Sequence, residues 1–144
     1  MVSAKDVPAT KLAERLEEEL KKFEEIKPPG WSMFAKSGVS RARPPQQADF
    51  WYKRTASVLR RIYLNGPVGV EKLRTFYGGR KRRGSRPARF RKGSGSIVRK
   101  ILQQLDAAGL TKKVEKGKLG RVITAKGRKL LDNIAYEVSK EGKV

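Results

Sequence analysis

The chain has 144 residues, of which 35 are lysine or arginine and 14 are aspartate or glutamate, giving a formal net charge of +21. This length suits a single domain, and a charge of this size favours a polyanionic partner such as nucleic acid. Cysteine and histidine are both absent, which excludes disulfides, thiolate metal sites and histidine-based catalysis.

Other classes of protein are excluded by missing motifs. No apolar run approaches the roughly 20 residues of a membrane-spanning helix, and residues 1–9 lack the apolar core of a signal peptide. Clustered carboxylates at metal-ligand spacing, a P-loop and a dinucleotide glycine pattern are missing as well. The sequence therefore predicts a cytoplasmic protein that is not an enzyme, contacts no membrane, and holds neither a cofactor nor a metal.

The N-terminal segment predicts an amphipathic helix, with Thr10 as its cap and Pro28 as its stop. Its acids and bases nearly balance, and they form opposite-charge pairs at i,i+4 spacing. We interpret its apolar stripe as core packing, with a partner-binding helix as the alternative. The stripe consists of Leu12, Leu16, Leu20, Phe23 and Ile26, and the polar face of Glu17, Glu18, Glu19, Lys21 and Lys22.

A short helix ending at Gly38 is expected next, with Trp31, Phe34 and Val39 on one side, before a polar connector over residues 40–47. A longer helix then runs over residues 50–64, with Asp49 as its cap. Its aromatic residues favour core packing over base stacking. The apolar face comprises Trp51, Thr55, Val58, Leu59, Ile62 and Tyr63, and the outward face Lys53, Arg54, Arg60 and Arg61.

A strongly basic stretch, GGRKRRGSRPARFRKGSGS, covers residues 78–96 and follows a short helix over residues 68–77. It carries eight cations and no acid, so it predicts a mobile loop that orders against a polyanion. A solvated charge run or a localisation signal is the alternative. The short helix is expected to turn Val70, Leu73, Phe76 and Tyr77 inward.

The clearest helix covers residues 97–108 and ends at Gly109. Its N-terminus is rich in glycine and serine, and the free amides beside Ser94 and Ser96 predict a phosphate site. The buried stripe is Ile97, Val98, Ile101, Leu102, Leu105 and Ala108, and the exposed face is Arg99, Lys100, Gln103 and Gln104.

Strands over residues 110–114 and 121–123 predict a hairpin with a basic tip, and Thr124 caps a last helix over residues 125–139. Its apolar positions are Leu130, Leu131, Ile134, Tyr136 and Val138. Three helices followed by a hairpin are the order of a winged helix. The predicted fold class is therefore mainly α: a winged-helix-like helical domain with a short β-hairpin wing and an additional N-terminal helix. It forms one domain over residues 1–144, with the N-terminal helix and connector in 1–47 and the core in 48–140.

The distribution of charge favours RNA as the partner. Between Pro28 and Leu105 there are 19 basic residues and two acids, and the bases are spread over helices, loop and wing. Such a spread suits a protein enclosed by several RNA segments. The alternative is a winged-helix DNA-binding transcriptional regulator, in which Arg99, Gln103 and Gln104 would read a major groove.

The sequence also resembles a known family, the archaeal and eukaryotic small-subunit ribosomal protein S-nineteen-e. The motifs that carry the resemblance are DFWYKRTASVLRRIYLNGPVGVEKLRTFYGGR, RPARFRKGSGSIVRKILQQLDAAGL and GRVITAKGRKLLD. The resemblance implies a place in the head of the small ribosomal subunit, bound to the 3′ major domain of its rRNA and beside other small-subunit proteins. It also implies a role in maturation of that subunit, and we expect a monomer when the protein is free.

Family positions that carry RNA contacts map onto the helix over residues 50–64, the helix over residues 97–108 and the basic stretch. The resemblance assigns this role to Arg54 and Arg60, to Arg99 and Lys100, and to the Gly-Gly-Arg motif that opens the basic stretch. Together with the basic stretch itself, the candidate RNA-binding residues are Arg54, Arg60, Arg61, Gly78, Gly79, Arg80, Lys81, Arg82, Arg83, Arg86, Arg89, Arg91, Lys92, Ser94, Ser96, Arg99 and Lys100.

Overall fold

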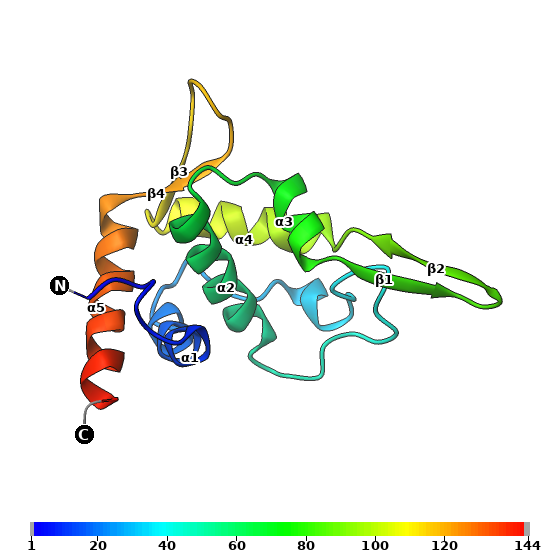
Figure 1. Cartoon of the computed structure of the whole chain (residues 1–144), viewed down its shortest axis with the longest axis horizontal. Coiled ribbons are helices and arrows are strands. Elements are labelled where there is room, and N and C mark those ends of the chain that lie inside the picture. The colour runs from blue at the N-terminus through cyan, green and yellow to red at the C-terminus, as the bar shows by residue number, and fades with distance from the viewer. Residues whose placement is uncertain (1, 143–144) are drawn as a thin grey trace.

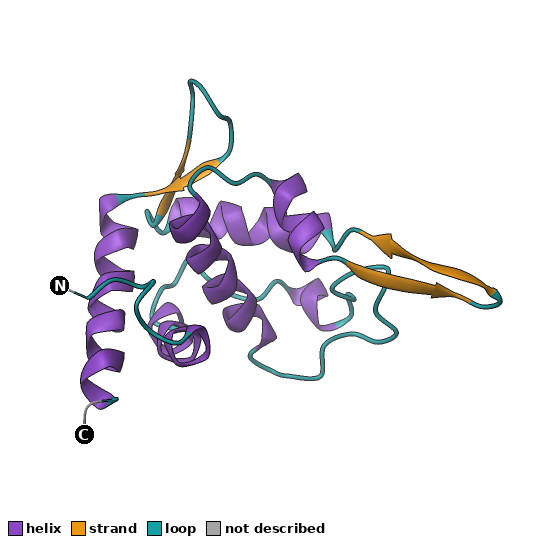
Figure 2. Ribbon diagram, in the orientation of Figure 1, coloured by secondary structure: helices purple, strands orange, loops and turns teal. Residues whose placement is uncertain are grey.

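Helices make up the body of the protein, and two antiparallel β-hairpins extend from it (Figure 1). The computed structural model describes residues 2–142. In Figure 2 the helices gather at the centre, and the two hairpins leave at separate edges. The elements in chain order are α1 (Ala9–Leu20), the 3-10 helix η1 (Gly30–Met33), α2 (Phe50–Asn65), α3 (Val70–Tyr77), β1 (Gly79–Arg83), β2 (Arg86–Arg91), α4 (Gly95–Ala107), β3 (Thr111–Lys113), β4 (Arg121–Ile123) and α5 (Ala125–Glu141).

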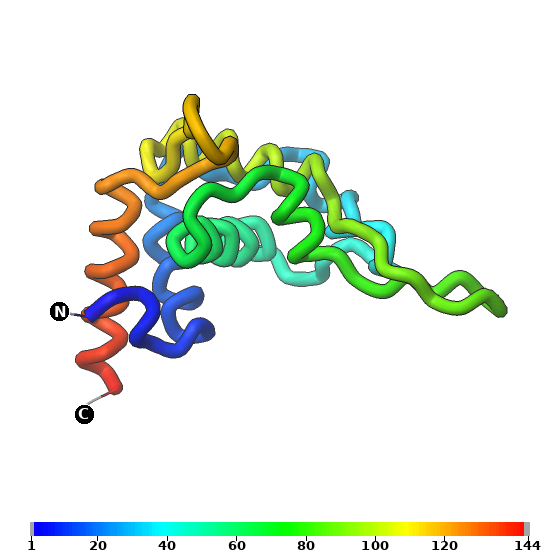
Figure 3. Tube along the Cα trace, turned by 45° about the horizontal axis from the view of Figure 1, so that its top comes forward, coloured from blue at the N-terminus to red at the C-terminus, as the bar shows by residue number. Residues whose placement is uncertain are grey.

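A single cluster of apolar side chains joins the helices, and it forms because each helix carries a stripe at helical spacing. Helix α1 lies between α2 and α5 (Figure 3), so the N-terminal helix belongs to the same core as the rest. The fully buried side chains include Leu12, Leu16, Leu20, Leu59, Ile62, Leu73, Ile101, Leu102, Leu105, Leu110 and Leu131.

The winged-helix arrangement that the sequence predicts is confirmed in α2, α3, α4 and the β3–β4 wing. The wing is fastened to the α2–α3 connection, because Val68 and Arg121 exchange backbone hydrogen bonds of 2.9 and 3.1 Å. Gly120 makes this approach possible. Its φ is +139°, and a Cβ atom there would lie 2.9 Å from the Val68 backbone.

The first helix differs from the prediction at both ends. Thr10 lies inside α1 and Pro8 occupies the cap position, without a side-chain hydrogen bond. The helix ends at Leu20, before the prolines, because tertiary contacts hold the next residues in turns: Ile26 is buried, and the Lys27 carbonyl accepts a 2.7 Å hydrogen bond from Gln104. Glu17, expected on the polar face, is buried and pairs with Lys21 at 3.3 Å.

Several apolar side chains of the predicted helices are exposed. The predicted short helix after Pro29 shrinks to η1, which leaves Trp31, Phe34 and Val39 at the surface. Phe76 and Tyr136 are also exposed, because the core is already filled by their neighbours on α3 and α5. Of the expected caps, Thr124 accepts a hydrogen bond from Gly127 N at 3.3 Å, as predicted. Asp49 occupies the cap position of α2 without a side-chain hydrogen bond to the helix backbone.

Candidate nucleic-acid interface

The basic stretch folds as a β-hairpin, so the prediction of a loop without regular structure was wrong. Strands β1 and β2 pair antiparallel, and Figure 1 shows them reaching away from the helices. The turn residues Gly84 and Ser85 explain the hairpin. Gly84 has a φ of +71°, and only glycines among the described residues have a positive φ. A positive φ at the first turn residue and a negative φ at the second are the pattern of a two-residue II′ turn, whose twist matches that of the strands.

A bulge interrupts the hairpin near its tip. The register shifts between Lys81 and Arg83, so that Arg82 on β1 lies against two residues of β2, one of which is Pro87. Proline has no N–H group, and a bulge is one of the few strand positions that tolerate it. The Arg83 guanidinium donates two hydrogen bonds to the Pro87 carbonyl, at 3.0 and 2.8 Å, which fixes this arginine across the turn.

Like charges face one another across the hairpin. Lys81 pairs with Arg89, and Arg83 pairs with Arg86. Directly opposed like charges destabilise a sheet, and among the hairpin cations Lys92 alone forms an ion pair within residues 2–142. The hairpin is therefore a concentrated cationic arm that a polyanion would stabilise.

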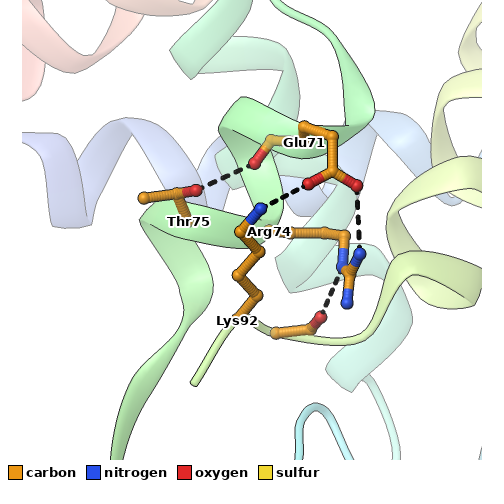
Figure 4. Close-up of polar contacts among 5 residues, drawn as sticks. Glu71, Arg74, Thr75 and Lys92 are labelled. Carbon is orange, nitrogen blue, oxygen red and sulfur yellow. Dashed lines mark hydrogen bonds and ion pairs between the residues drawn. The ribbon is translucent and has the colours of Figure 1, made fainter. Parts of the chain in front are cut away.

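One carboxylate holds the base of the hairpin. Figure 4 shows Glu71 of α3 accepting hydrogen bonds from Lys92 at 2.7 Å and Arg74 at 3.0 Å. Arg74 also donates to the Gly93 carbonyl at 3.0 Å. The hydrogen bond from Lys92, followed by that from Arg74, lowers the pKa of Glu71 below its ordinary value. Lys92, a candidate RNA contact, is thus engaged by this cluster in the free protein.

Gly78 and Gly79, where the hairpin begins, allow neighbouring atoms to pack closely against the backbone. A Cβ atom on Gly78 would lie 2.5 Å from the Arg91 carbonyl oxygen and 2.6 Å from the Phe90 ring, and one on Gly79 would lie 3.0 Å from Ser40 Oγ. At Gly78 only glycine fits without a shift of the backbone, whereas at Gly79 the Ser40 side chain would have to move. These residues position the hairpin, and the RNA contact expected of them stays a prediction.

The sequence predicts that the three arginines of α2 point outward, but in the structure they are half-buried. The guanidinium carbon of Arg54 lies 4.1 Å from the centre of the Tyr77 ring, and that of Arg61 lies 3.8 Å from the centre of the Phe76 ring. Arg60 Nε is buried without a hydrogen-bond partner among the described residues. Stacking on aromatic faces lets Arg54 and Arg61 remain charged while partly desolvated.

Arg54 lines a pocket of about 510 Å³ beside the hairpin base. Arg41 and Lys53 share the lining, which among residues 2–142 includes no carboxylate. Burial lowers the pKa of the Arg54 guanidinium, and the nearby charge of Arg41 acts in the same direction. Arginine nevertheless keeps its charge in proteins, so this pocket can accept an anion such as an RNA phosphate.

The start of α4 forms a second cationic concavity. The Ser94 hydroxyl caps the helix by accepting a 3.4 Å hydrogen bond from Ile97 N, and Ser96 is exposed in the first turn. A pocket of about 330 Å³ there is lined by Lys36, Arg74, Lys92 and Ser94 among others. Free amides and cations together fit a phosphate group.

Farther along α4, Arg99, Lys100 and Gln103 are exposed as predicted, but Gln104 is buried. It accepts a 2.8 Å hydrogen bond from Trp51 Nε1 and donates one to the Lys27 carbonyl. Gln104 is therefore a structural residue, and it is not available to read bases in a major groove as the DNA-binding alternative requires.

Four cations that line the two pockets are missing from the candidate residues: Lys36 and Arg41 of the segment before α2, Lys53 of α2 and Arg74 of α3. A signal for the first two was present, because no acid lies between Glu25 and Asp49. Within the described part of the chain, no group of acidic side chains could hold a metal ion, and no helix has the length and apolarity to cross a membrane.

Comparison with known proteins gives a consistent match. The model of the family described as "Ribosomal protein S19e" matches residues 3–141. A relative from Aeropyrum pernix, named "Small ribosomal subunit protein eS19", is 51% identical, covering 98% of this chain and 92% of its own length. Proteins of the same name from Haloarcula marismortui and Thermoplasma volcanium are 44% and 41% identical, each covering 98% of this chain and 94% and 92% of their own lengths.

Proposed function

The chain belongs to the ribosomal protein S19e family, a family of structural proteins rather than enzymes, and from this we propose that it is a component of the small ribosomal subunit that binds the subunit's rRNA. It is a cytoplasmic protein associated with ribosomes. Its site is the head of the subunit, on the 3′ major domain of the rRNA and beside other small-subunit proteins. The free protein is a monomer, and its incorporation supports maturation of the subunit.

The observation that carries this proposal is the opposition of like charges on the β1–β2 hairpin. The pairs Lys81 with Arg89 and Arg83 with Arg86 face one another without acids between them. A strand pairing of this kind gains stability when phosphates lie along both strands. The hairpin is held at a fixed base by Glu71, so the cations are presented to RNA as an ordered arm.

The hairpin base also connects the arm to the helices. Gly78 lines the Arg54 pocket on one side, and Lys92 lines the concavity at the start of α4 on the other. Phosphates bound at these two sites would lie on either side of the hairpin base, next to RNA that contacts the hairpin itself. The mechanism is charge neutralisation combined with shape fitting, and several RNA segments are held together as the subunit assembles.

The proposal is tested by replacing Arg80 and Arg82 with alanine. Both side chains are exposed, and Arg83 is left intact because it bonds across the turn. Binding of the purified protein to small-subunit rRNA is measured over a range of salt concentrations. We expect weaker binding and a slope of log K against log salt that is shallower by about 0.7 to 0.9 for each lost phosphate contact.

The matched control is the double replacement of Lys5 and Lys11 by alanine, which removes the same charge from exposed positions in the N-terminal region. We expect this variant to keep the wild-type slope. If both double variants change binding equally, the hairpin is not a specific interface. An rRNA affinity that is insensitive to the hairpin variant contradicts the proposal.

A further inference from the structure

Four large apolar side chains lie exposed within the connector between α1 and α2. Their exposed fractions are 42% for Trp31, 75% for Met33, 80% for Phe34 and 56% for Val39. The Trp31 ring meets the buried Trp51 ring edge-on at a centroid distance of 6.0 Å, which fixes its orientation. So many exposed apolar groups in one short segment mark a binding surface. We call residues 31–39 the aromatic connector.

Cations and no acids accompany the aromatic connector. Lys36 lies within it, and Arg41 and Arg43 follow, while no acid occurs between Glu25 and Asp49. An apolar protein partner would gain nothing from this excess of positive charge. Unpaired RNA offers both components that the surface fits, because its bases present apolar faces and its backbone presents phosphates.

A cleft of about 450 Å³ lies between the aromatic connector and the start of α2. Met33 and Trp51 contribute apolar walls, and Ser32, Gln46 and Gln47 contribute polar groups. An apolar cleft with a few amide groups is suited to a flat heteroaromatic ring, since amides can bond the donors and acceptors along its edge. No charged residue of the described chain lines this cleft.

The aromatic connector is continuous with the proposed RNA interface. The Ser37 carbonyl accepts a 2.9 Å hydrogen bond from Ser94 N at the start of α4, and Gly38 forms a β-bridge with Gly93. In Figure 1 this cyan segment runs beside the base of the β1–β2 hairpin. A strand of RNA leaving the hairpin base therefore reaches the connector directly, past a single carboxylate, Glu71, that is already paired with Lys92 and Arg74.

We propose that the aromatic connector binds unpaired nucleotides of the RNA, with bases stacked on Trp31 and Phe34 and one base inserted in the neighbouring cleft. The inference rests on the proposed function, since it identifies single-stranded RNA as one form of the RNA ligand. The hairpin and the α4 start neutralise phosphates, whereas the aromatic connector contacts bases. Stacking does not depend on base identity, so this surface selects for strand unpairing rather than for sequence.

The test compares Phe34→Ala with wild type in binding a short single-stranded RNA and a duplex of the same length. Phe34 is mostly exposed, so its replacement leaves the core intact. We expect the affinity for the single strand to fall at least about five-fold, the equivalent of losing one stacked base. The slope against salt and the affinity for the duplex should stay unchanged. Quenching of tryptophan fluorescence by the single strand provides a second measurement, because the chain has two tryptophans, of which Trp31 belongs to the aromatic connector and Trp51 lines the cleft.

Tyr136→Ala is the matched control, because it removes an exposed aromatic ring from α5, far from the connector. We expect it to bind both RNAs like wild type. Equal single-strand affinities for Phe34→Ala and wild type would overturn the proposal. If Phe34→Ala binds RNA normally but fails to join small subunits, the connector contacts a neighbouring protein, which also overturns it. Neither result affects the proposed function, which the hairpin variant tests separately.

Discussion

Trp51 of α2 donates a 2.8 Å hydrogen bond from Nε1 to Oε1 of Gln104 on α4. The same amide donates to the Lys27 carbonyl at 2.7 Å, so one side chain joins α2, α4 and the segment after α1. Both Trp51 and Gln104 are buried. A buried polar group is retained at little cost only when its partners are present, and here both partners are within the protein.

Replacing Gln104 with alanine should therefore destabilise the fold. The variant leaves Trp51 Nε1 and the Lys27 carbonyl without partners and opens a small cavity, at a combined cost of about 2 to 4 kcal/mol in the free energy of unfolding. Urea denaturation measures this change. Gln103→Ala, at the exposed neighbouring position, is the control and should change the stability by less than about 0.5 kcal/mol. Similar stabilities for the two variants would contradict the structural role of Gln104.

The sequence predicted those elements whose signals are local. Helix α4 has an uninterrupted stripe and ends before Gly109, which has a φ of +78°, and α5 begins at its Thr124 cap. Helix α1 ended earlier than predicted because its periodic pattern continues into residues that tertiary contacts hold in turns, and local periodicity does not report such contacts.

The sequence shows where the positive charge of the candidate site is concentrated, but it did not predict the conformation of that stretch. The run of eight cations marked residues 78–96 as a basic stretch. Because the prediction was based on charge, it overlooked the two-residue turn at Gly84 and Ser85 that makes a hairpin. Gln104 was assigned to the exposed face by helical spacing, which cannot show that Trp51 needs an acceptor. Arg54 and Arg61 of α2 lie under aromatic rings of α3, and these contacts join residues that are separated in sequence.

The hairpin depends on the absence of a side chain at Gly78. In Gly78→Ala the new Cβ atom would meet the Arg91 carbonyl oxygen at 2.5 Å, so the strands must separate. We expect the free energy of unfolding to fall by about 1 to 3 kcal/mol and the hairpin amides to exchange faster. Gly30→Ala, where nothing lies within 4 Å, is the control and should stay within about 0.5 kcal/mol of wild type. Unchanged hairpin exchange in Gly78→Ala would show that the backbone accommodates the methyl group.

Glu71→Gln tests whether the carboxylate orders the hairpin base. The glutamine loses the charge that pairs with Lys92 and Arg74, so amides near Gly93 should exchange faster at neutral pH. The pKa of Glu71 is lowered in the folded state, chiefly by the Lys92 hydrogen bond. Its stabilising contribution is therefore complete above the ordinary carboxyl range of about pH 4 and is lost as the pH falls through the lower folded pKa.

The difference between wild type and Glu71→Gln should consequently disappear in acid, which hydrogen exchange followed by NMR can measure. Glu115→Gln, at an exposed position of the wing, is the control and should leave exchange at the hairpin base unchanged. An exchange rate in Glu71→Gln equal to that of wild type at neutral pH would show that the glycine contacts alone hold the hairpin.

The Glu17 carboxyl should give the stability of the fold the opposite dependence on pH. Burial raises the pKa of its carboxyl, and the neighbouring Asp49 carboxylate adds to the rise, while Lys21 opposes it. A carboxyl whose pKa is raised on folding binds its proton more tightly in the folded state. Its ionisation therefore lowers stability as the pH rises from the ordinary carboxyl range through the folded pKa, and the deficit is complete above that pKa.

In Glu17→Gln the side chain keeps its shape but carries no charge. We expect a higher melting temperature than wild type at pH 7 and a difference that shrinks toward pH 4. Glu18→Gln, on the exposed face of the same helix, is the control and should show no such trend. A melting temperature below that of wild type at pH 7 would mean that the 3.3 Å ion pair with Lys21 outweighs the cost of burying the charge. The difference between the two curves should begin to grow in the ordinary carboxyl range and level off above the folded pKa, because the glutamine variant lacks this titration.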